Sequence, residues 1–394
     1  MALVECAADS MQRCKHMNIV STDSGQPSSA RGKSQSGKIV QSNPVFVVGP
    51  SRSGTTMLQR ALSLHSRIHI SAETHWFDDL RGRCSNGILT DSERQQILDW
   101  FLALSHKPFG YAGVPGQGWL SRDEVEQAAL QLSGSDSKSG VVNCDSYFAA
   151  FCELDARRHN KTRWGEKTPR HVFRIYDIHQ SFAGAKVICI LRDPRAMVAS
   201  YSKWSERITG VGVDSSPEQR REYNRSKASY HPVIMALMWR GAARASMKAR
   251  RRLGEDVVRV VRYEDLVGQA EQCLSDITDW LGEKFEPEML DIPMANSSFN
   301  GYQSRVGFSS NTSDYWQSTL SKTELAVINL LCKKEMKARN YRLKSEKEIS
   351  SPWLNAWFAA PHFLTLPLAL WRAINANKDR TGKLFSYVWR RIHP

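Results

Sequence analysis

"VFVVGPSRSGTTMLQRAL", residues 45–62, passes from an apolar strand through a short polar turn into a helix. Gly49 and Gly54 let the backbone turn tightly around an anion, and the helix that follows offers free N–H groups and the positive end of its dipole. Nucleotide triphosphatase loops share this spacing but carry a lysine where Thr55 stands. The stretch predicts a phosphate-binding loop without that lysine, although an ordinary strand–helix connection would look similar.

The positive charge of this loop comes from Arg52, whose planar guanidinium suits a tetrahedral oxyanion group. Thr55 and Thr56 can add hydroxyl donors at the start of the helix. A triphosphatase needs its lysine to bridge the terminal phosphates, so the loop indicates a different phosphorylated ligand.

A second anion-binding segment is predicted in "CILRDPRAMVASYSKW", residues 189–204. Arg192 ends an apolar strand, and Ser200 lies about two helical turns further along. An arginine at a strand end and a serine on the next helix can converge on one phosphate. The structural alternative is that Arg192 pairs with Asp193 or caps the sheet.

Around these segments, apolar runs rich in β-branched residues alternate with helical patterns. Strands are predicted at 44–48, 67–71, 186–192 and 256–263, and the region 78–163 contains helical patterns at 92–104, 122–132 and 145–154. Continuous apolar character suits strands that are covered on both faces. The alternation predicts an α/β fold with a P-loop-like parallel sheet flanked by helices, and 78–163 predicts a helical insertion.

The chain of 394 residues has 41% hydrophobic residues, which is ample for a buried core. Residues 18–42 are rich in Ser, Gly and Gln, so we expect a disordered arm over 1–42. The globular domain is expected over 43–348 and a separate tail over 349–394.

The net charge of +14 and pI near 9.5 imply an anionic partner. Zinc-finger spacing, an RNA-binding aromatic signature and a basic helix with heptads are missing from the sequence, so we do not expect nucleic acid. The eight cysteines are scattered without a C-x-x-C pair, and the N terminus lacks a signal-like apolar run. These features predict a reducing, cytoplasmic setting.

Taken together, the motifs resemble the sulfotransferase superfamily, which uses 3′-phosphoadenosine 5′-phosphosulfate (PAPS). The resemblance covers roughly 43–342 and rests on "SRSGTT" (51–56), "WGEKTPRH" (164–171), "LRDPRAMVASYS" (191–202), "VRYEDLV" (261–267) and "DYWQSTLSKTEL" (314–325), similar to the bacterial and tyrosylprotein-type branch. Ser51 stands where the family usually has proline, a mild departure because the backbone and Arg52 carry the binding.

The resemblance implies a PAPS site that needs no metal. The 5′-phosphosulfate would be held by Ser51, Arg52, Ser53, Gly54, Thr55 and Thr56, the 3′-phosphate by Arg192 and Ser200, and the adenosine side by Tyr263, with Arg305 and Trp316 added from the late loop.

The resemblance also implies in-line sulfuryl transfer, with Arg52 and Lys167 stabilising charge. Glu73 is the favoured base, by the spacing of the tyrosylprotein-type branch. His171 competes, because the cytosolic branch uses a histidine shortly after the lysine, although a loop or capping role also fits His171. A surface position remains the alternative for Lys167.

Two other function classes stay open from the residues alone, a P-loop nucleotide kinase and a non-catalytic nucleotide-binding module. The acceptor is a small molecule, lipid, glycan or peptide, and the sequence predicts no oligomeric state. The insertion is expected to shape its pocket, with aromatic residues that could stack on a ring or fill the core: Trp76, Trp100, Phe101, Trp119 and Tyr147.

The tail begins with 353–371, nineteen residues without Asp, Glu, Lys or Arg. Pro361 and Pro367 are expected to interrupt it, which argues against a simple spanning helix. The basic residues that follow, opposed only by Asp379, give a net charge of +5. The tail therefore predicts either a peripheral membrane contact through 353–394 or a helix pair docked on the domain.

Overall fold

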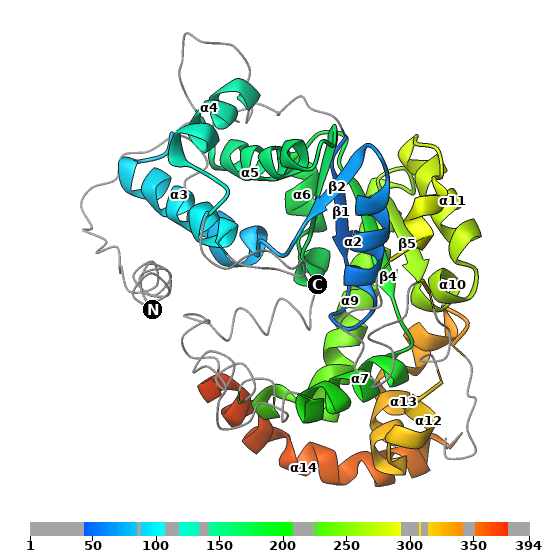
Figure 1. The fold of residues 1–394 in the computed structure, drawn as a ribbon. Coiled ribbons are helices and arrows are strands. Elements are labelled where there is room, and N and C mark those ends of the chain that lie inside the picture. The colour runs from blue at the N-terminus through cyan, green and yellow to red at the C-terminus, as the bar shows by residue number, and fades with distance from the viewer. Residues whose placement is uncertain are drawn as a thin grey trace, which may run out of the picture.

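Five parallel strands form one sheet in the computed structural model of the chain (Figure 1). The structure describes residues 43–84, 88–106, 118–133, 142–207, 224, 227–292, 307–308, 314–341 and 351–376. The strands are β1 (Val45–Val48), β2 (Ile68–Ser71), β3 (Arg163–Lys167), β4 (Lys186–Leu191) and β5 (Val258–Arg262), in the order β2-β3-β1-β4-β5. The predicted α/β class with a parallel sheet is confirmed.

Strand β3 is the one strand that the sequence patterns did not predict. Its residues, "RWGEK", include three charged side chains, yet all five positions are buried. Gly165 pairs with Val45, and a Cβ at Gly165 would lie 2.3 Å from the Val45 carbonyl oxygen, so this position needs a glycine. Strand β3 is held by its central place in the sheet rather than by its own apolar content.

Helices cover both faces of the sheet. Their bounds are α2 (Thr55–Leu64), α3 (Asp91–Ser105), α4 (Arg122–Leu132), α5 (Cys144–Arg158), α6 (Ile175–Ser181), α7 (Pro194–Arg207), α9 (Pro232–Leu253), α10 (Tyr263–Gly268), α11 (Ala270–Leu281), α12 (Trp316–Thr319), α13 (Lys322–Lys337) and α14 (Pro352–Ala376), with the short turns η1 (Trp76–Leu80), η2 (Arg81–Arg83), η3 (Pro169–Phe173) and η5 (Pro287–Leu290). Capping boxes begin α3, α4 and α13.

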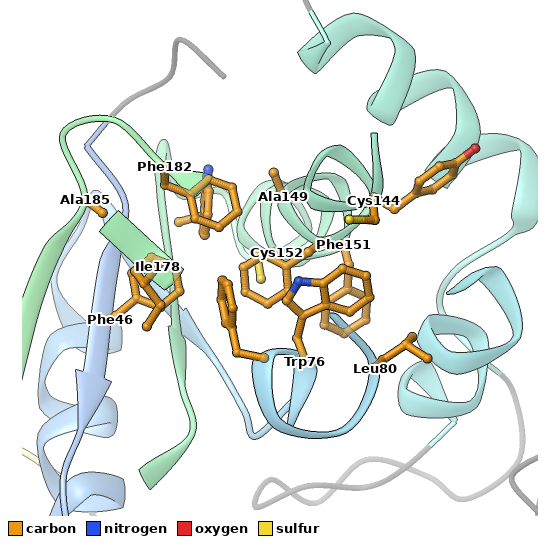
Figure 2. Packing of buried hydrophobic residues seen from close by; sticks show 14 of the residues in the cluster. Phe46, Trp76, Leu80, Cys144, Ala149, Phe151, Cys152, Ile178, Phe182 and Ala185 are labelled. Carbon is orange, nitrogen blue, oxygen red and sulfur yellow. The ribbon is translucent and has the colours of Figure 1, made fainter. Parts of the chain in front are cut away.

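Alternation along β1 divides the core between the two faces of the sheet. Val45 and Val47 belong to the cluster built with α2 and α11, whereas Phe46 and Val48 belong to the cluster built with α3–α6. Figure 2 shows the second cluster, in which the Phe46 ring lies 5.8 Å from that of Phe182. The helices between β2 and β3 are thus part of the main core.

The aromatic residues of the insertion fill this core. Trp76, Phe101 and Tyr147 are buried in the cluster. Trp100 donates its indole N–H to the Thr74 carbonyl oxygen at 3.1 Å, and the Trp119 ring packs 5.5 Å from that of Phe151. Packing accounts for all five aromatic residues that the sequence offered for an acceptor pocket.

A third cluster joins α7, α9, α12, α13 and α14, at the end of the molecule away from α3–α5 (Figure 1). The expectation that Pro361 and Pro367 interrupt the tail is wrong, because both lie inside the continuous helix α14. Both prolines are exposed, so the carbonyl groups that lose a helical partner can bind water. Within the described residues, no helix is long and apolar enough to cross a membrane.

Candidate active site

The carboxyl ends of the five parallel strands meet at one edge of the sheet, where open α/β sheets bind ligands. The loop after β1, Glu73 after β2, Lys167 at the end of β3, Arg192 after β4 and Tyr263 after β5 all lie there. The structure therefore brings together residues from segments that the sequence analysis could connect only through the family resemblance.

The loop after β1 is shaped by close backbone contacts. Gly49 donates its N–H to the Pro169 carbonyl oxygen at 3.1 Å. Gly54 has a φ of 93°, and a Cβ there would lie 2.5 Å from the Tyr263 ring. Arg52 also has a positive φ, 67°, which is uncommon for a residue with a long side chain.

The inner side of the loop has unsatisfied hydrogen-bonding capacity. The Ser53 hydroxyl is buried and has no hydrogen-bond partner among the residues that the structure describes. Helix α2 starts at Thr55, and no described side chain caps its N terminus. A buried donor beside uncapped helical N–H groups is the arrangement that binds a phosphate or sulfate.

The second predicted anion segment joins the loop directly. Arg52 Nε donates to Ser200 Oγ at 3.3 Å, and Arg192 Nη1 donates to the Arg52 carbonyl oxygen at 3.3 Å. The Arg192 guanidinium lies 4.4 Å from the centre of the Tyr263 ring. A guanidinium group thus lies over an aromatic face next to the arginine-bearing loop, which suits an anionic nucleotide.

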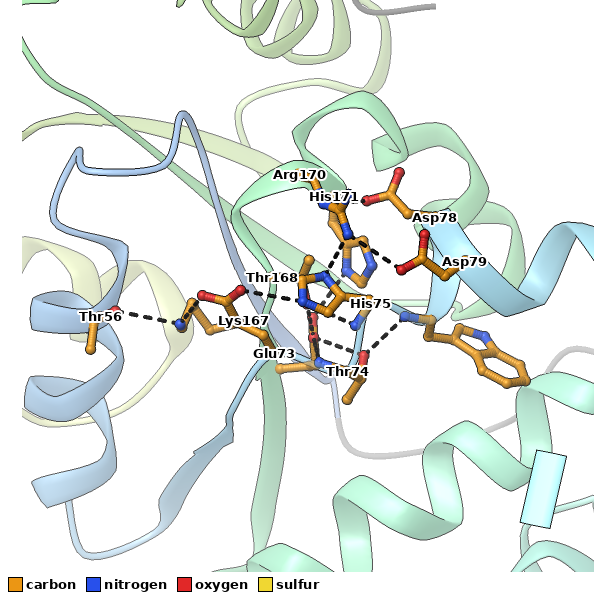
Figure 3. A network of polar contacts seen from close by, with 12 residues as sticks. Thr56, Glu73, Thr74, His75, Asp78, Asp79, Lys167, Thr168, Arg170 and His171 are labelled. Atoms are coloured by element: carbon orange, nitrogen blue, oxygen red, sulfur yellow. Dashed lines mark hydrogen bonds and ion pairs between the residues drawn. The ribbon is translucent and has the colours of Figure 1, made fainter. Parts of the chain in front are cut away.

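A chain of polar contacts runs from the loop helix across β3 to the segment after β2 (Figure 3). Lys167 Nζ lies 3.4 Å from Thr56 Oγ1 and 2.7 Å from Glu73 Oε1. Glu73 Oε2 lies 3.5 Å from His75 Nε2, and an Arg170 amino group lies 3.0 Å from His75 Nδ1. A cation, a carboxylate and an imidazole are therefore linked next to the phosphate-binding loop.

Charges in this chain fix the protonation states. Burial raises the pKa of the Glu73 carboxyl, but the Lys167 ammonium and His75 lower it by more, so this pKa lies below the ordinary glutamate value of 4.5. Burial, together with the Arg170 guanidinium, lowers the pKa of His75 from 6.5 to about 4. At neutral pH the carboxylate is ionised and the imidazole is neutral.

Neither His75 nor Arg170 was among the predicted site residues. His75 follows Glu73 by two positions and has a φ of 55°. Arg170 lies within the quoted motif "WGEKTPRH". Both positions were visible in the sequence, but their meeting depends on how η3 lies against η1.

The other base candidate, His171, is fully buried in a separate network. Its Nδ1 lies 3.0 Å from Glu166 Oε2, and its Nε2 accepts the Phe77 N–H at 3.3 Å. Thr74 donates both its N–H and its hydroxyl to Glu166 Oε1. Both nitrogens of His171 are therefore engaged in holding β3 against η1, and Glu166 pairs with His171 rather than with Lys167.

Three of the predicted cofactor residues take no part in the contacts described above. Ser51 is half-buried in the loop. Trp316 is buried in the cluster around α13, and the Arg195 guanidinium lies 4.2 Å from the centre of the Trp316 ring. Arg305 lies outside the described residues.

A small hollow with a cavity volume of about 20 Å³, partly open to solvent, adjoins the outer side of the loop. It is lined by the loop backbone, by η3 and by apolar side chains of α7 and α9, among them Met197, Met235 and Met238. A hollow of this size holds about one water molecule, so an apolar group enters beside the loop only if the adaptable methionine side chains move.

His69, Asp155 and His159 form a cluster of metal-ligand type on β2 and the end of α5. His69 Nε2 lies 2.9 Å from Asp155 Oδ2, and the two imidazole rings stack with centres 4.0 Å apart. Two histidine ligands of one tetrahedral zinc ion would hold their ring centres about 5 Å apart. The cluster has the geometry of a histidine pair on a shared carboxylate.

Comparison with known proteins relates the chain to sulfotransferases. The model of the sulfotransferase family matches residues 44–287. The 3-alpha-hydroxysteroid sulfotransferase of Cavia porcellus is 28% identical over 193 residues, which cover 47% of this chain and 61% of that protein, so the match spans less than two thirds of the relative.

Two solved structures show a more distant likeness. The sulfotransferase domain of the Synechococcus PCC 7002 olefin synthase has 18% identity and a TM-score of 0.46, covering 77% of this chain and 98% of that one. Retinol dehydratase in a complex with retinol and PAP has 16% identity and a TM-score of 0.35, covering 79% of this chain and 86% of that one.

The chain belongs to the sulfotransferase family, because the family model matches well over half of its length. This confirms the resemblance drawn from the motifs. The family consists of transferase enzymes that use PAPS and need no metal for transfer, so PAPS is the co-substrate of this class.

Proposed function

We propose that this protein transfers the sulfuryl group of PAPS to a hydroxyl or amine of its acceptor. The observation that carries the proposal is the position of Lys167, whose Nζ lies between Thr56 of the phosphate-binding helix and the Glu73 carboxylate. One cation thus connects the anion-binding loop with a group that can accept a proton.

The residues present fit PAPS. The orphaned Ser53 hydroxyl and the N terminus of α2 suit the 5′-phosphosulfate, together with Thr55 and Thr56. Arg192 and Ser200 suit the 3′-phosphate. The contact of Tyr263 with both the Arg192 guanidinium and Gly54 supports its assignment to the adenosine side.

Bound PAPS supplies an activated sulfuryl group, whose bond to the 5′-phosphate oxygen breaks as the acceptor oxygen bonds to sulfur. Glu73 takes the proton from the acceptor hydroxyl. Lys167 and Arg52 stabilise the negative charge that develops on the sulfuryl and leaving phosphate oxygens. His75 and Arg170 are positioning residues, because they hold the Glu73 carboxylate from the side opposite Lys167.

Glu73 fits the base role better than His171. The Glu73 carboxylate is ionised at neutral pH and its side chain is 32% exposed, so an acceptor can reach it. His171 is fully buried, and both of its ring nitrogens already have partners. An acceptor would have to displace the Phe77 N–H to use it.

For the acceptor we propose a small hydroxylated molecule with an apolar body. The apolar side chains of α7 and α9 that lie beside the loop support this class over a glycan. The related guinea-pig protein is named for a hydroxysteroid acceptor. The proposed setting is cytoplasmic with a peripheral membrane contact through 353–394, and the six free cysteines among the described residues fit a reducing compartment.

Calorimetry with PAP, PAPS and ATP tests the binding step. We expect one site for PAP in metal-free buffer with EDTA, and no comparable site for ATP. Tight binding that requires magnesium and ATP would instead support a nucleotide kinase.

Transfer of radiolabelled sulfuryl from PAPS tests catalysis, with hydroxysteroids, simple phenols and a polar glycan as acceptors. We expect product with apolar hydroxylated acceptors. Tight PAPS binding without transfer to any of them, and without slow hydrolysis of PAPS, would support a non-catalytic binding module.

A further inference from the structure

Exposed apolar surface is concentrated on one helix of the C-terminal region. Within the described residues, thirteen large hydrophobic side chains are exposed, and eight of them lie on α14. Trp353 is 86% exposed, Leu364 82% and Trp357 77%. An exposed apolar cluster of this kind marks an interaction surface, because isolated surface hydrophobic residues would be scattered.

Five of these eight side chains lie along one line of α14. Trp353, Trp357, Leu364, Leu368 and Trp371 follow one another at steps of 4, 7, 4 and 3 residues, so they share one side of the helix, here called the α14 face. At about 1.5 Å per residue, this face extends about 27 Å along the helix axis.

The opposite side of α14 is docked on the domain. Ala359 and Asn355 are buried, and Phe358 and Leu366 pack against the cluster built by α9 and α13. His362 Nε2 lies 3.1 Å from Thr323 Oγ1 of α13. The helix is therefore anchored through its less apolar side, and its more apolar side faces outward.

Basic residues outnumber acidic ones in the sequence of the C-terminal region. No acidic residue occurs from 349 to 378, and Arg372 follows the last tryptophan of the face directly. Including Asp379, residues 349–394 carry a net charge of +5. An occupant of the α14 face must therefore offer an apolar layer bordered by negative charge.

We propose that the α14 face binds the surface of an anionic lipid bilayer, with the helix lying in the plane of the interface. Tryptophan favours the boundary between acyl chains and headgroups, and basic residues beside it attract anionic headgroups. The absence of a charged residue between Trp353 and Trp371 lets the whole face enter that layer. A second copy of the chain fits less well, because the sequence of its own α14 carries Arg372 and no acidic residue, so it offers no negative charge.

Vesicle co-sedimentation of the full chain tests the proposal, with phosphatidylcholine vesicles and with vesicles containing about one third phosphatidylserine. The bound fraction should rise at least tenfold with the anionic lipid, should fall at high salt, and should be accompanied by a blue shift of tryptophan fluorescence.

The test variant is Trp353→Ser, Trp357→Ser and Leu364→Ser, which should lower binding to anionic vesicles at least tenfold. The matched control is Ile88→Ser and Leu130→Ser, which removes exposed apolar side chains elsewhere and should leave binding unchanged. Equal melting temperatures of the three proteins establish that α14 stays docked.

Three results would overturn the proposal. The first is failure of the full chain to bind anionic vesicles at low salt. The second is equal loss of binding in both variants. The third is a dimer in light scattering that the α14 variant converts to a monomer, since this would assign the face to a second copy of the chain. None of these results bears on sulfuryl transfer, which is measured without vesicles.

Discussion

Folded proteins usually bury apolar side chains and expose charged ones. The carboxyl edge of the sheet instead buries charged side chains, and helix α14 instead exposes apolar ones. At the edge, charged groups are buried: Glu166 is fully buried and Lys167 is 4% exposed. On α14, Trp353 and Trp357 are exposed to water. The buried charges at the edge are compensated by partners within the protein, Glu166 by His171 and Lys167 by Glu73, whereas the exposed tryptophans of α14 have no such compensation within the described residues.

The two regions also differ in how they hold their side chains. The edge connects its charges through hydrogen bonds between segments far apart in the sequence, so a change at one residue should affect a specific step. The α14 face consists of independent contacts on one helix, so single changes there should add gradually. Mutations at the edge test this difference most directly.

The largest expected effect is that of Glu73→Gln. It removes the proton acceptor and keeps the shape, so kcat should fall about 10² to 10⁴-fold while the affinity for PAP changes little. Single-turnover transfer and PAP calorimetry measure the two quantities. Glu286→Gln, the same change on an exposed loop outside the edge, should retain full activity. Full activity in Glu73→Gln would remove Glu73 from the base role.

Next in size is the effect of Glu166→Gln on stability. It replaces the buried carboxylate that accepts hydrogen bonds from Thr74, Thr168 and His171 with a neutral amide, which should cost roughly 3 kcal/mol of unfolding free energy. The control Glu126→Gln changes a surface ion pair 3.9 Å long and should cost below about 1 kcal/mol. Chemical denaturation measures both. Wild-type stability combined with lost catalysis would mean that this carboxylate acts in the reaction instead of in the fold.

Arg192→Ala should weaken PAP binding by roughly 1.5–3 kcal/mol, because a charge-assisted phosphate contact is lost. Arg244→Ala is the matched control, since it also removes an arginine, whose Nε lies 2.6 Å from Glu335 Oε1, but away from the edge. Calorimetry at two salt concentrations should show a smaller salt dependence for the Arg192 variant alone. Equal affinities in the two variants would contradict the 3′-phosphate assignment.

The comparison of the two regions also shows what the sequence could predict. The bounds of α4, predicted at 122–132, agree with the structure because local periodicity and a capping box determine them. Strand β3 was not predicted, because its sequence "RWGEK" has no apolar run. The strand is buried because it lies between β1 and β2 in the sheet.

The site itself was predictable only where a motif carried it. Arg52, Glu73, Lys167 and Arg192 follow from motif resemblance, and the structure brings them to one edge. The His75–Arg170 contact joins residues 95 positions apart and has no local signal. On α14, the two prolines indicated a break, but the packing of the docked side overrides that local preference.

The smallest expected effect concerns the pH dependence of stability. In the unfolded chain His75 has its ordinary pKa of 6.5, while in the folded protein burial beside Arg170 lowers this pKa to about 4. Between these values the unfolded state binds the proton and the folded state does not, so the free energy of unfolding should fall as the pH drops from about 6.5 to about 4. The His75 side chain is 31% exposed, and solvent screening should reduce the total change to the order of 1 kcal/mol. Urea denaturation at several pH values between 7 and 4 should therefore measure this change. The free energy of unfolding should fall less steeply with falling pH for His75→Asn than for the wild type, whereas the surface variant His106→Asn should keep the wild-type pH dependence. Identical pH dependence for His75→Asn and the wild type would mean that folding leaves the pKa of His75 at its ordinary value, and a difference of the opposite sign would mean that the Glu73 carboxylate holds the imidazole in its charged form.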